Sequence, residues 1–336
     1  MFIDFSQYKL FSDCEWKWYE RCVLGSQRAP KPGQQDTPLV LGSLVHEGLR
    51  TLTQQRRVEI PQATIAQHNP SPECVASAYR LLLGYSQQYP EESSDRTQFG
   101  RKKFYCEAPL RFPLDPLCEG LARVDQYFHC DEPQEIQDGR GGTLTLSPGW
   151  WIYEHKTKKA ETRMGNWIES WRTCMQADFQ LHALAHHIGD VPQGLIINVL
   201  EKPKIYEPVR TCKACKQRQE FAEYLVHAMG YECPQCHAVQ EFDPPKPKAP
   251  DEPKYYRVQV TRSISDLERS IDEIRAVSRR MLALAQGGQV PLRATERCVD
   301  LIWGRCEYWE PHSTLSRAQG WNGFVQIQEP LAYATN

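Results

Sequence analysis

Two closely spaced cysteine pairs place the strongest constraint on how this chain can fold. Cys212 and Cys215 form one CxxC pair, Cys233 and Cys236 form a second, and 17 residues separate the pairs. Two such knuckles at this separation are typical of a zinc ribbon, in which four thiolates close a tetrahedral site. The metal supplies stability that so short a segment cannot obtain from an apolar core. We therefore expect a structural Zn²⁺ site with a complete ligand set.

The composition is that of an ordinary globular chain in a reducing compartment. Hydrophobic residues make up 40% of the 336 residues, charged residues 24%, and the formal net charge is −2. Overall charge therefore does not indicate a nucleic-acid binder, and any basic surface must be local. An odd count of 13 cysteines that includes two CxxC pairs favours metal binding over a disulfide framework. No apolar run approaches a membrane span and no signal peptide opens the chain, which predicts a cytoplasmic protein without a membrane partner.

Hydrophobic periodicity predicts helices and strands around the cysteine pairs. The predicted helices lie at 13–25, 40–55, 73–89, 171–189 and 265–288. The predicted strands lie at 121–128, 150–157, 194–200 and 255–260, with a turn-rich loop or hairpin at 131–149. This order predicts an α/β core whose mixed sheet is covered by helices.

The cysteine-rich segment interrupts this core. Residues 1–204 are expected to form the first part of the core, and residues 251–336 its C-terminal strand, helix and cysteine-containing tail. Residues 205–250 hold the predicted zinc ribbon and a proline-rich linker. Because this segment lies between two predicted strands, the ribbon is predicted to be an insertion into the core.

One predicted strand ends in the sequence YEHKTKK, residues 153–159. Side chains alternate along a strand, so Glu154 and Lys156 share one face and His155 points to the other. The carboxylate can bind a hard divalent cation, and the lysine can orient a water or stabilise charge that develops on a phosphate. Asp125 in the preceding strand is the natural second ligand and His46 a candidate third, a set that favours Mn²⁺ over Mg²⁺ more than oxygen ligands alone. Alone, a Glu-X-Lys sequence is usually a surface ion pair; the order of the surrounding residues is what points to a site.

In that order the residues resemble the PD-(D/E)XK nuclease superfamily, and within it the RecB-like branch of phage-type exonucleases and CRISPR-associated adaptation nucleases. The motifs of that branch are a GxxxH helix, a GxxD strand, an ExK strand and a QxxxY helix. Their counterparts here are Gly42 with His46, Asp125, Glu154 with Lys156, and the helix that holds Gln180. Two positions depart from the pattern, because Ala122 replaces the glycine of GxxD and Leu184 the tyrosine of QxxxY.

The resemblance implies a three-layer α/β/α, restriction-endonuclease-like core that hydrolyses phosphodiester bonds with Mg²⁺ or Mn²⁺. It implies a metal held by His46, Asp125, Glu154 and the backbone carbonyl of His155, with Lys156 as the catalytic lysine. Gln180 would contact DNA or hold the site together. Gln176, one turn earlier, is a second candidate for that role because the register of the QxxxY motif is open.

A second group of cysteines lies near the two ends of the chain. Its members are Cys14, Cys22, Cys298 and Cys306. Many RecB-like nucleases bind a [4Fe–4S] cluster through one cysteine near the N-terminus and three near the C-terminus. Only two lie near the C-terminus here, so Cys22 would be the fourth ligand. Four thiolates suit such a cluster, and a second zinc ion or simple buried thiols remain as alternatives.

The function that the resemblance implies is that of a deoxyribonuclease, an exonuclease on single-stranded DNA or DNA ends. It would act in recombination, repair or phage DNA processing, in a bacterial or phage-infected cell, with DNA and a helicase or recombination protein as partners. One alternative is a CRISPR-associated nuclease in spacer acquisition. Another is a non-catalytic DNA- or protein-binding module on a nuclease fold. The complete set of His46, Asp125, Glu154 and Lys156 argues against that last reading.

Overall fold

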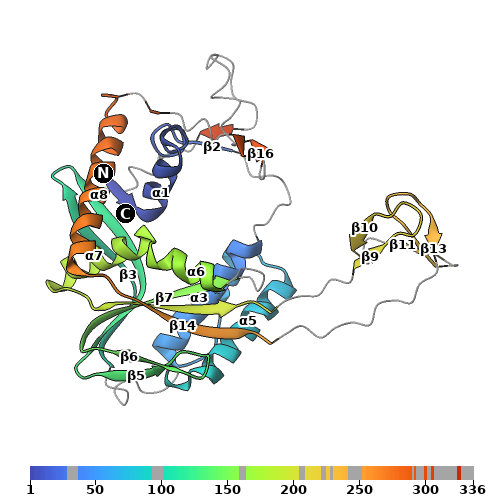
Figure 1. Ribbon diagram of the computed structural model, residues 1–336, viewed down its shortest axis with the longest axis horizontal. Helices are drawn as coiled ribbons and strands as arrows, with labels where there is room; N and C mark the ends of the chain where they lie inside the picture. Colours follow the sequence, from blue (N-terminus) through green and yellow to red (C-terminus); the bar gives the residue numbers. More distant parts are fainter. Residues whose placement is uncertain are drawn as a thin grey trace.

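A six-stranded mixed sheet forms the centre of the protein (Figure 1). Its strands are β1 (Phe2–Asp4), β3 (Arg101–Asp115), β4 (Cys118–Cys130), β7 (Gly149–Lys158), β8 (Gly194–Glu201) and β14 (Lys254–Val260). The order is β1-β4-β7-β8-β14, and β3 pairs with β4. β1 is parallel to β4 and β7 is parallel to β8, whereas the other pairings are antiparallel. The mixed sheet is thus the α/β core that the sequence predicts.

The structure is a computed structural model, and its description covers most of the chain. The described residues are 1–28, 37–92, 101–158, 164–203, 209–220, 225–227, 230–240, 252–289, 291–292, 299–300, 304–305 and 324–326. Within them, two short antiparallel strand pairs lie outside the main sheet: β2 (Ser26–Arg28) pairs with β17 (Phe324–Gln326), and β15 (Val299–Asp300) pairs with β16 (Gly304–Arg305).

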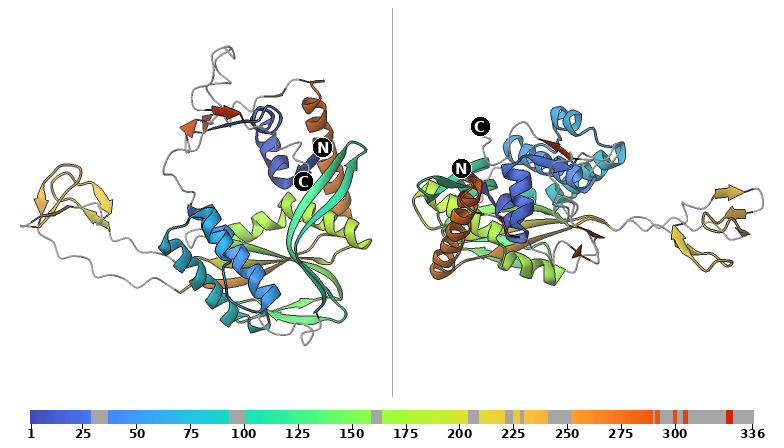
Figure 2. Two further views of the ribbon diagram at one scale, coloured as in Figure 1. Left: turned by 180° about the vertical axis from the view of Figure 1, so that it is seen from behind. Right: turned by 90° about the horizontal axis from the view of Figure 1, so that it is seen from above.

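Three helices cover one face of the sheet (Figure 2). They are α1 (Phe5–Asp13), α7 (Met175–Ile188) and α8 (Ile264–Ala285), and their apolar faces join the largest hydrophobic cluster. The stripe predicted for residues 265–288 becomes α8, which begins with a capping box between Ser263 and Asp266. α7 ends at Gly189, whose φ of 71° is the left-handed conformation that glycine adopts most readily. Burial of these apolar stripes stabilises the three helices on this face of the sheet, since helix stability comes mainly from such packing.

The opposite face carries helices at one end and a hairpin at the other. The helices are α3 (Thr37–Gln55) and α5 (Pro72–Gln88), with α4 (Gln62–His68) beside α3 and the short η2 (Pro90–Glu92) after α5. The hairpin consists of β5 (Gln134–Gln137) and β6 (Thr143–Leu146), and it packs on Phe128, Trp151 and Ile196. The turn-rich stretch at 131–149 therefore forms the predicted hairpin, and the protein has the three layers expected.

The cysteine-rich segment forms a separate small unit between β8 and β14, as Figures 1 and 2 both show. Its strands are β9 (Val209–Thr211), β10 (Arg218–Glu220), β11 (Leu225–His227), β12 (Gly230–Glu232) and β13 (Val239–Gln240). They form a two-stranded and a three-stranded antiparallel sheet. β8 and β14 pair with each other from Glu201↔Lys254 onward, so the unit is inserted between two neighbouring strands.

Three local predictions need correction. The helix predicted at 13–25 is broken, because α1 begins earlier, α2 (Glu15–Trp18) follows it, and Tyr19–Val23 form a π-helix. The helix predicted at 171–189 begins at Met175, and a separate helix, α6 (Met164–Arg172), precedes it. β3 was not predicted at all. It contains Pro109 and Pro113, which argue against a strand interior but are tolerated here because β4 is its only pairing partner among the described strands.

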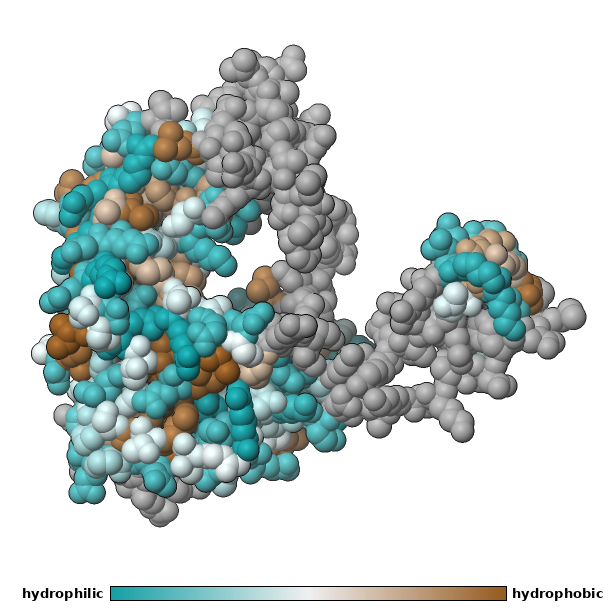
Figure 3. All heavy atoms as spheres, viewed as in Figure 1, coloured by the Kyte–Doolittle hydropathy of each residue, from teal (hydrophilic) through white to brown (hydrophobic). Residues whose placement is uncertain are grey.

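The surface in Figure 3 is mainly hydrophilic, and its hydrophobic residues are scattered over the described part. Among the described helices, none combines the length and the hydropathy needed to cross a membrane.

Candidate active site

The sheet opens where β4 and β7 separate. The two strands pair from Cys130↔Gly149 to Gln126↔Tyr153, and their ladder stops there. Beyond this point β7 continues to pair with β8, which leaves the side of β7 that faces β4 free. The backbone N–H of His155 on that side donates to Oδ2 of Asp125, at 2.7 Å. The Asp125 carboxylate thus satisfies a backbone group that lost its strand partner, and it is fixed at the fork.

A group of three potential metal ligands surrounds this carboxylate. Nδ1 of His46, from α3, lies 3.4 Å from Oδ1 of Asp125. Glu107 of β3 lies across from Asp125, because the flanking pairs are Cys106↔Gln126 and Ala108↔Val124. One ligand atom from each of His46, Glu107 and Asp125 lies within 4.8 Å of the others. The sequence predicted His46 and Asp125 to lie together, and they do.

Glu107 is the member of this group that the sequence did not predict. Its φ is 50°, a left-handed conformation that costs a residue with a Cβ about 1–3 kcal/mol. Such strain is concentrated at functional sites, where the surrounding structure maintains it. A signal existed in the sequence, since an acidic residue two positions before Pro109 breaks a basic and aromatic stretch, but without a predicted strand nothing placed it near Asp125.

The Glu-X-Lys pair forms a second group on the α7 side of the sheet. Nζ of Lys156 lies 2.5 Å from Oε1 of Glu154. The same carboxylate accepts hydrogen bonds from Nε2 of Gln176, at 2.9 Å, and from Nε2 of Gln180, at 2.6 Å. Lys156 also lies over the ring of Trp171, 5.3 Å from its centre. Both candidate glutamines therefore contact Glu154, one turn of α7 apart, which explains why the sequence could not choose between them.

His155 faces the other way, as strand alternation predicts. Its ring packs edge-on against Tyr85 of α5, at 6.1 Å between ring centres, and burial lowers its pKa to about 4. The ring is therefore neutral near pH 7 and belongs to the core. The proposed ligand from this residue is its backbone carbonyl, and that assignment stays a prediction.

The glycine of the GxxxH motif lies where helix α3 faces β7. A Cβ built on Gly42 would lie 3.9 Å from Oγ1 of Thr157 in β7, which is an ordinary van der Waals contact. Four residues later, on the same face of the helix, His46 reaches the fork. The motif thus marks the face of α3 that carries the imidazole to Asp125, and a larger residue than glycine would also fit at position 42.

The ionisation of these groups reflects crowded charge in a buried place. Burial and the neighbouring Asp125 raise the pKa of Glu107 to about 7. Burial alone would raise the pKa of Asp125, but His46 and the other nearby cationic groups lower it to about 2. Burial opposes the charge on Lys156, yet the adjacent Glu154 raises the pKa of its ammonium overall. Lys156 is therefore an ammonium ion at neutral pH.

The residues at the fork fit a divalent cation. Two carboxylates and an imidazole converge within 4.8 Å, and the raised pKa of Glu107 reflects burial and then repulsion by Asp125, both of which a bound cation would offset. Oxygen ligands suit Mg²⁺, and the imidazole shifts the preference toward Mn²⁺. Glu154 is not within that three-residue group, and its predicted role as a ligand stays a prediction.

The four cysteines of the inserted unit also converge on one point. One ligand atom from each of Cys212, Cys215, Cys233 and Cys236 lies within 4.8 Å of the others. The sulfurs of Cys212 and Cys236 are 3.6 Å apart and those of Cys215 and Cys233 3.9 Å apart. Thiolates at 2.3 Å around one zinc ion would be about 3.8 Å apart. The spacing of the sulfurs is therefore compatible with a structural zinc site, and the identity of the ion stays a prediction.

The two knuckles of this site are built alike. The residue after each pair, Lys216 or His237, has φ near 60°, and its N–H donates at 2.9 Å to the carbonyl of the first cysteine. Backbone N–H groups, that of Cys215 first, lower the pKa of the Cys212 thiol to about 6. The loops thus stabilise a thiolate ready for metal.

The second group of cysteines is described only in part. Cys14 and Cys22 are buried, and burial raises the pKa of Cys22 to about 12. Cys298 and Cys306 lie outside the described residues. The metal predicted for this group, whether an iron–sulfur cluster or zinc, therefore stays a prediction.

Comparisons with known proteins agree with this geometry. Residues 4–112 match the family model of the PD-(D/E)XK nuclease superfamily, a stretch that includes His46 and Glu107. The chain has no match among curated proteins. Among solved structures it is similar to a "putative exonuclease" from Eubacterium rectale, with 10% identity, a TM-score of 0.50, and coverage of 94% of this chain and 90% of the other.

The fold is that of the PD-(D/E)XK nucleases. The match of residues 4–112 to the family model supports a nuclease, and the structural neighbour supports the fold. The mixed sheet and its helices match a PD-(D/E)XK nuclease fold, and the four-cysteine unit is compatible with a small zinc-binding insertion.

Proposed function

We propose that the protein is a metal-dependent deoxyribonuclease that hydrolyses phosphodiester bonds at the fork between β4 and β7. One observation carries this proposal. The fork brings a candidate cation site, made by His46, Glu107 and Asp125, next to an ion-paired Lys156. Phosphodiester hydrolysis needs these two features together, a site for a cation and a fixed positive group beside the reacting phosphate.

The chain's own residues would have separate tasks. Asp125 with His46 and Glu107, and Glu154 if it turns toward them, would hold Mg²⁺ or Mn²⁺. The bound ion supplies positive charge to the phosphate and lowers the pKa of a bound water. Lys156 presents its ammonium to the phosphate or to the attacking water. Gln176 and Gln180 of α7 donate hydrogen bonds to the Glu154 carboxylate. They would therefore fix Glu154, which in turn would position Lys156.

The finer assignment follows the resemblance to RecB-like nucleases. We propose an exonuclease that acts on single-stranded DNA or DNA ends in recombination, repair or phage DNA processing, with a helicase or recombination protein as a partner. The name of the structural neighbour supports exonuclease activity as the first to test. A CRISPR-associated role would use the same chemistry with other partners, and the genes beside this one would distinguish the two.

Cleavage of end-labelled single-stranded and double-stranded DNA with Mg²⁺, Mn²⁺ or EDTA tests the proposal. We expect metal-dependent cleavage by the wild type, and its loss in Lys156→Ala and Asp125→Ala. Asp131→Ala is the matched control, because Asp131 also pairs with a histidine of β4, His129 at 2.9 Å, on the surface. Wild-type protein that binds DNA and cleaves it with neither metal would instead favour a binding module on a nuclease fold.

A further inference from the structure

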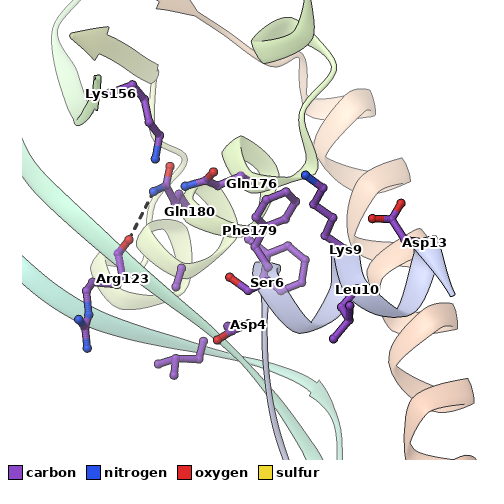
Figure 4. Close-up of a pocket in the computed structure, with 13 residues that line it drawn as sticks. Asp4, Ser6, Lys9, Leu10, Asp13, Arg123, Lys156, Gln176, Phe179 and Gln180 are labelled. Atoms are coloured by element: carbon purple, nitrogen blue, oxygen red, sulfur yellow. Dashed lines mark hydrogen bonds between the residues drawn. The ribbon is translucent and has the colours of Figure 1, made fainter. Parts of the chain in front are cut away.

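A cavity of about 610 Å³ opens directly beside Lys156. On one side Lys156, Gln176 and Gln180 line it, and Figure 4 shows these three side chains directed toward one another. The other side is formed by the end of β1, by α1 and by the start of β4. Its polar residues from β1 and α1 are Asp4, Ser6, Lys9 and Asp13. The space that the Glu154–Lys156 pair faces is therefore bounded by the N-terminal helix.

Lys9 is the cation that this helix offers to the cavity. It is exposed, and within the described part of the chain it makes no ion pair or hydrogen bond. Ser6 is also exposed and lies one turn earlier, on the same face of α1. Figure 4 places Lys9 and Lys156 on opposite sides of the cavity, with Gln176 between them. An anionic chain that passes through the cavity would meet a cation at each side.

The acidic residues of the lining limit where that anion can lie. Oδ1 of Asp4 accepts the backbone N–H of Gln7 at 2.8 Å, so this carboxylate caps α1. Asp13 lies one turn beyond Lys9, on the side away from Lys156 in Figure 4. Phosphate is therefore favoured between Lys9 and Lys156 and disfavoured beyond Lys9.

We propose that this cavity holds one unpaired DNA strand beside the scissile phosphate, with Lys9 as a positioning residue that binds a neighbouring phosphate. The inference rests on the proposed nuclease function and specifies its substrate. The volume lies in the range of roughly 300–1,000 Å³ typical of small-ligand pockets, which suits a flexible strand. A B-form duplex, whose major groove alone is about 12 Å wide, is too wide for such a space. Leu10, Leu121 and Ala122 provide apolar surface for sugars and bases.

Salt-dependent binding tests the role of Lys9. The probe is a fluorescein-labelled oligothymidylate, measured by anisotropy with the full-length protein in EDTA across a series of NaCl concentrations. Each phosphate contact to a single strand contributes about −0.7 to the slope of log K against log salt concentration. We expect Lys9→Ala to weaken binding several-fold. The slope should become less negative by about 0.7, the share of one phosphate contact. Lys9→Arg should restore both, because it keeps the positive charge at this position.

Lys254→Ala is the control, because Lys254 is an exposed lysine of β14 that does not line the cavity. A second arm compares cleavage of the oligothymidylate with that of a blunt-ended duplex, which has ends but no unpaired strand, and we expect only the unpaired strand to be cut. A slope unchanged by Lys9→Ala, or equal cleavage of the blunt-ended duplex, would overturn the inference while leaving the nuclease function intact. A wild type that cleaves neither DNA with Mg²⁺ or Mn²⁺ would overturn both.

Discussion

The backbone N–H of His155 donates a 2.7 Å hydrogen bond to the carboxylate of Asp125. Asp125 therefore has two tasks, one in the fold and one in the chemistry. Its Oδ2 replaces the strand partner that β7 loses at the fork, and its Oδ1 faces His46. The same side chain that accepts the backbone hydrogen bond is also one of the three potential ligands of the proposed cation.

Substitutions at Asp125 should separate these two tasks. Asp125→Asn keeps an oxygen that can accept from His155, so we expect its free energy of unfolding to fall by less than about 1 kcal/mol. Asp125→Leu leaves that buried N–H unpaired and should cost about 1–3 kcal/mol. Both variants should lose cleavage. Urea denaturation in EDTA with parallel nuclease assays checks this, and equal stability losses would contradict the structural task.

Glu107 should contribute to metal binding at the expense of stability. We expect both Glu107→Gln and Glu107→Gly to weaken Mn²⁺ binding at least about tenfold, a loss that even outer partners of metal ligands can cause. Glu107→Gly should also raise stability in EDTA by up to about 1 kcal/mol, because glycine adopts the left-handed backbone without strain.

Calorimetric titration with Mn²⁺ and denaturation in EDTA measure the two effects of Glu107 separately. Glu119→Gln is the matched control, since Glu119 is an exposed carboxylate of the neighbouring strand β4. If Glu107→Gln bound Mn²⁺ as tightly as the Glu119 variant, Glu107 would not be a ligand.

The zinc site should be needed for the inserted unit and not for the nuclease core. We expect wild-type protein to contain one zinc ion per chain in this unit and Cys233→Ser to lose it, because the other three thiolates cannot close the tetrahedron. The core should keep its cooperative unfolding, since β8 and β14 pair with each other. Zinc content by mass spectrometry and thermal denaturation are the measurements. Cys106→Ser, outside the four-cysteine group, should retain the zinc.

His182 should make one contribution to a loss of stability in mild acid, a loss that the raised pKa of Glu107 opposes. Burial, with Arg275 nearby, lowers the pKa of this histidine from 6.5 to about 4, and its Nε2 lies 2.9 Å from Oγ of Ser270. As the pH falls, the unfolded state therefore takes up a proton on His182 before the folded state does. The neutral His182 contributes fully to the free energy of unfolding above pH 6.5. This contribution, about 1–3 kcal/mol, is lost as the pH falls toward 4. Urea denaturation across this range should show a smaller loss for His182→Gln, and identical curves would argue against this origin.

Elements with strong local patterns were predictable from the sequence. The amphipathic stripe of α8 and the apolar run of β8 are buried as their patterns indicate. β3 was missed because its two prolines mark a strand that pairs on one side only, and a single sequence does not reveal which strand is an edge. The break between α1 and α2 was missed because the aromatic residues there pack both before and after it.

The site was predictable to the extent that its residues lie in recognisable elements. His46 and Asp125 were expected together because a helix and a strand with the right order carried them, and the structure brings them to 3.4 Å. To predict that Glu107 belongs to the site, the strand β3 and a left-handed residue within it would both have had to be predicted. The attachment of both glutamines to Glu154 depends on how α7 packs against β7, which periodicity alone does not determine.

The pairing of Glu201 with Lys254 has a consequence for how this protein could change over generations. The chain leaves the sheet and returns to it at adjacent positions, so for the core the whole zinc-binding unit is a hairpin loop, and loop-closure entropy depends only weakly on loop length. A single insertion or deletion event at this point could add, remove or exchange the unit while every strand keeps its neighbours. This topology would let the unit be exchanged as an accessory, and the proposed nuclease chemistry of the core could be inherited without it.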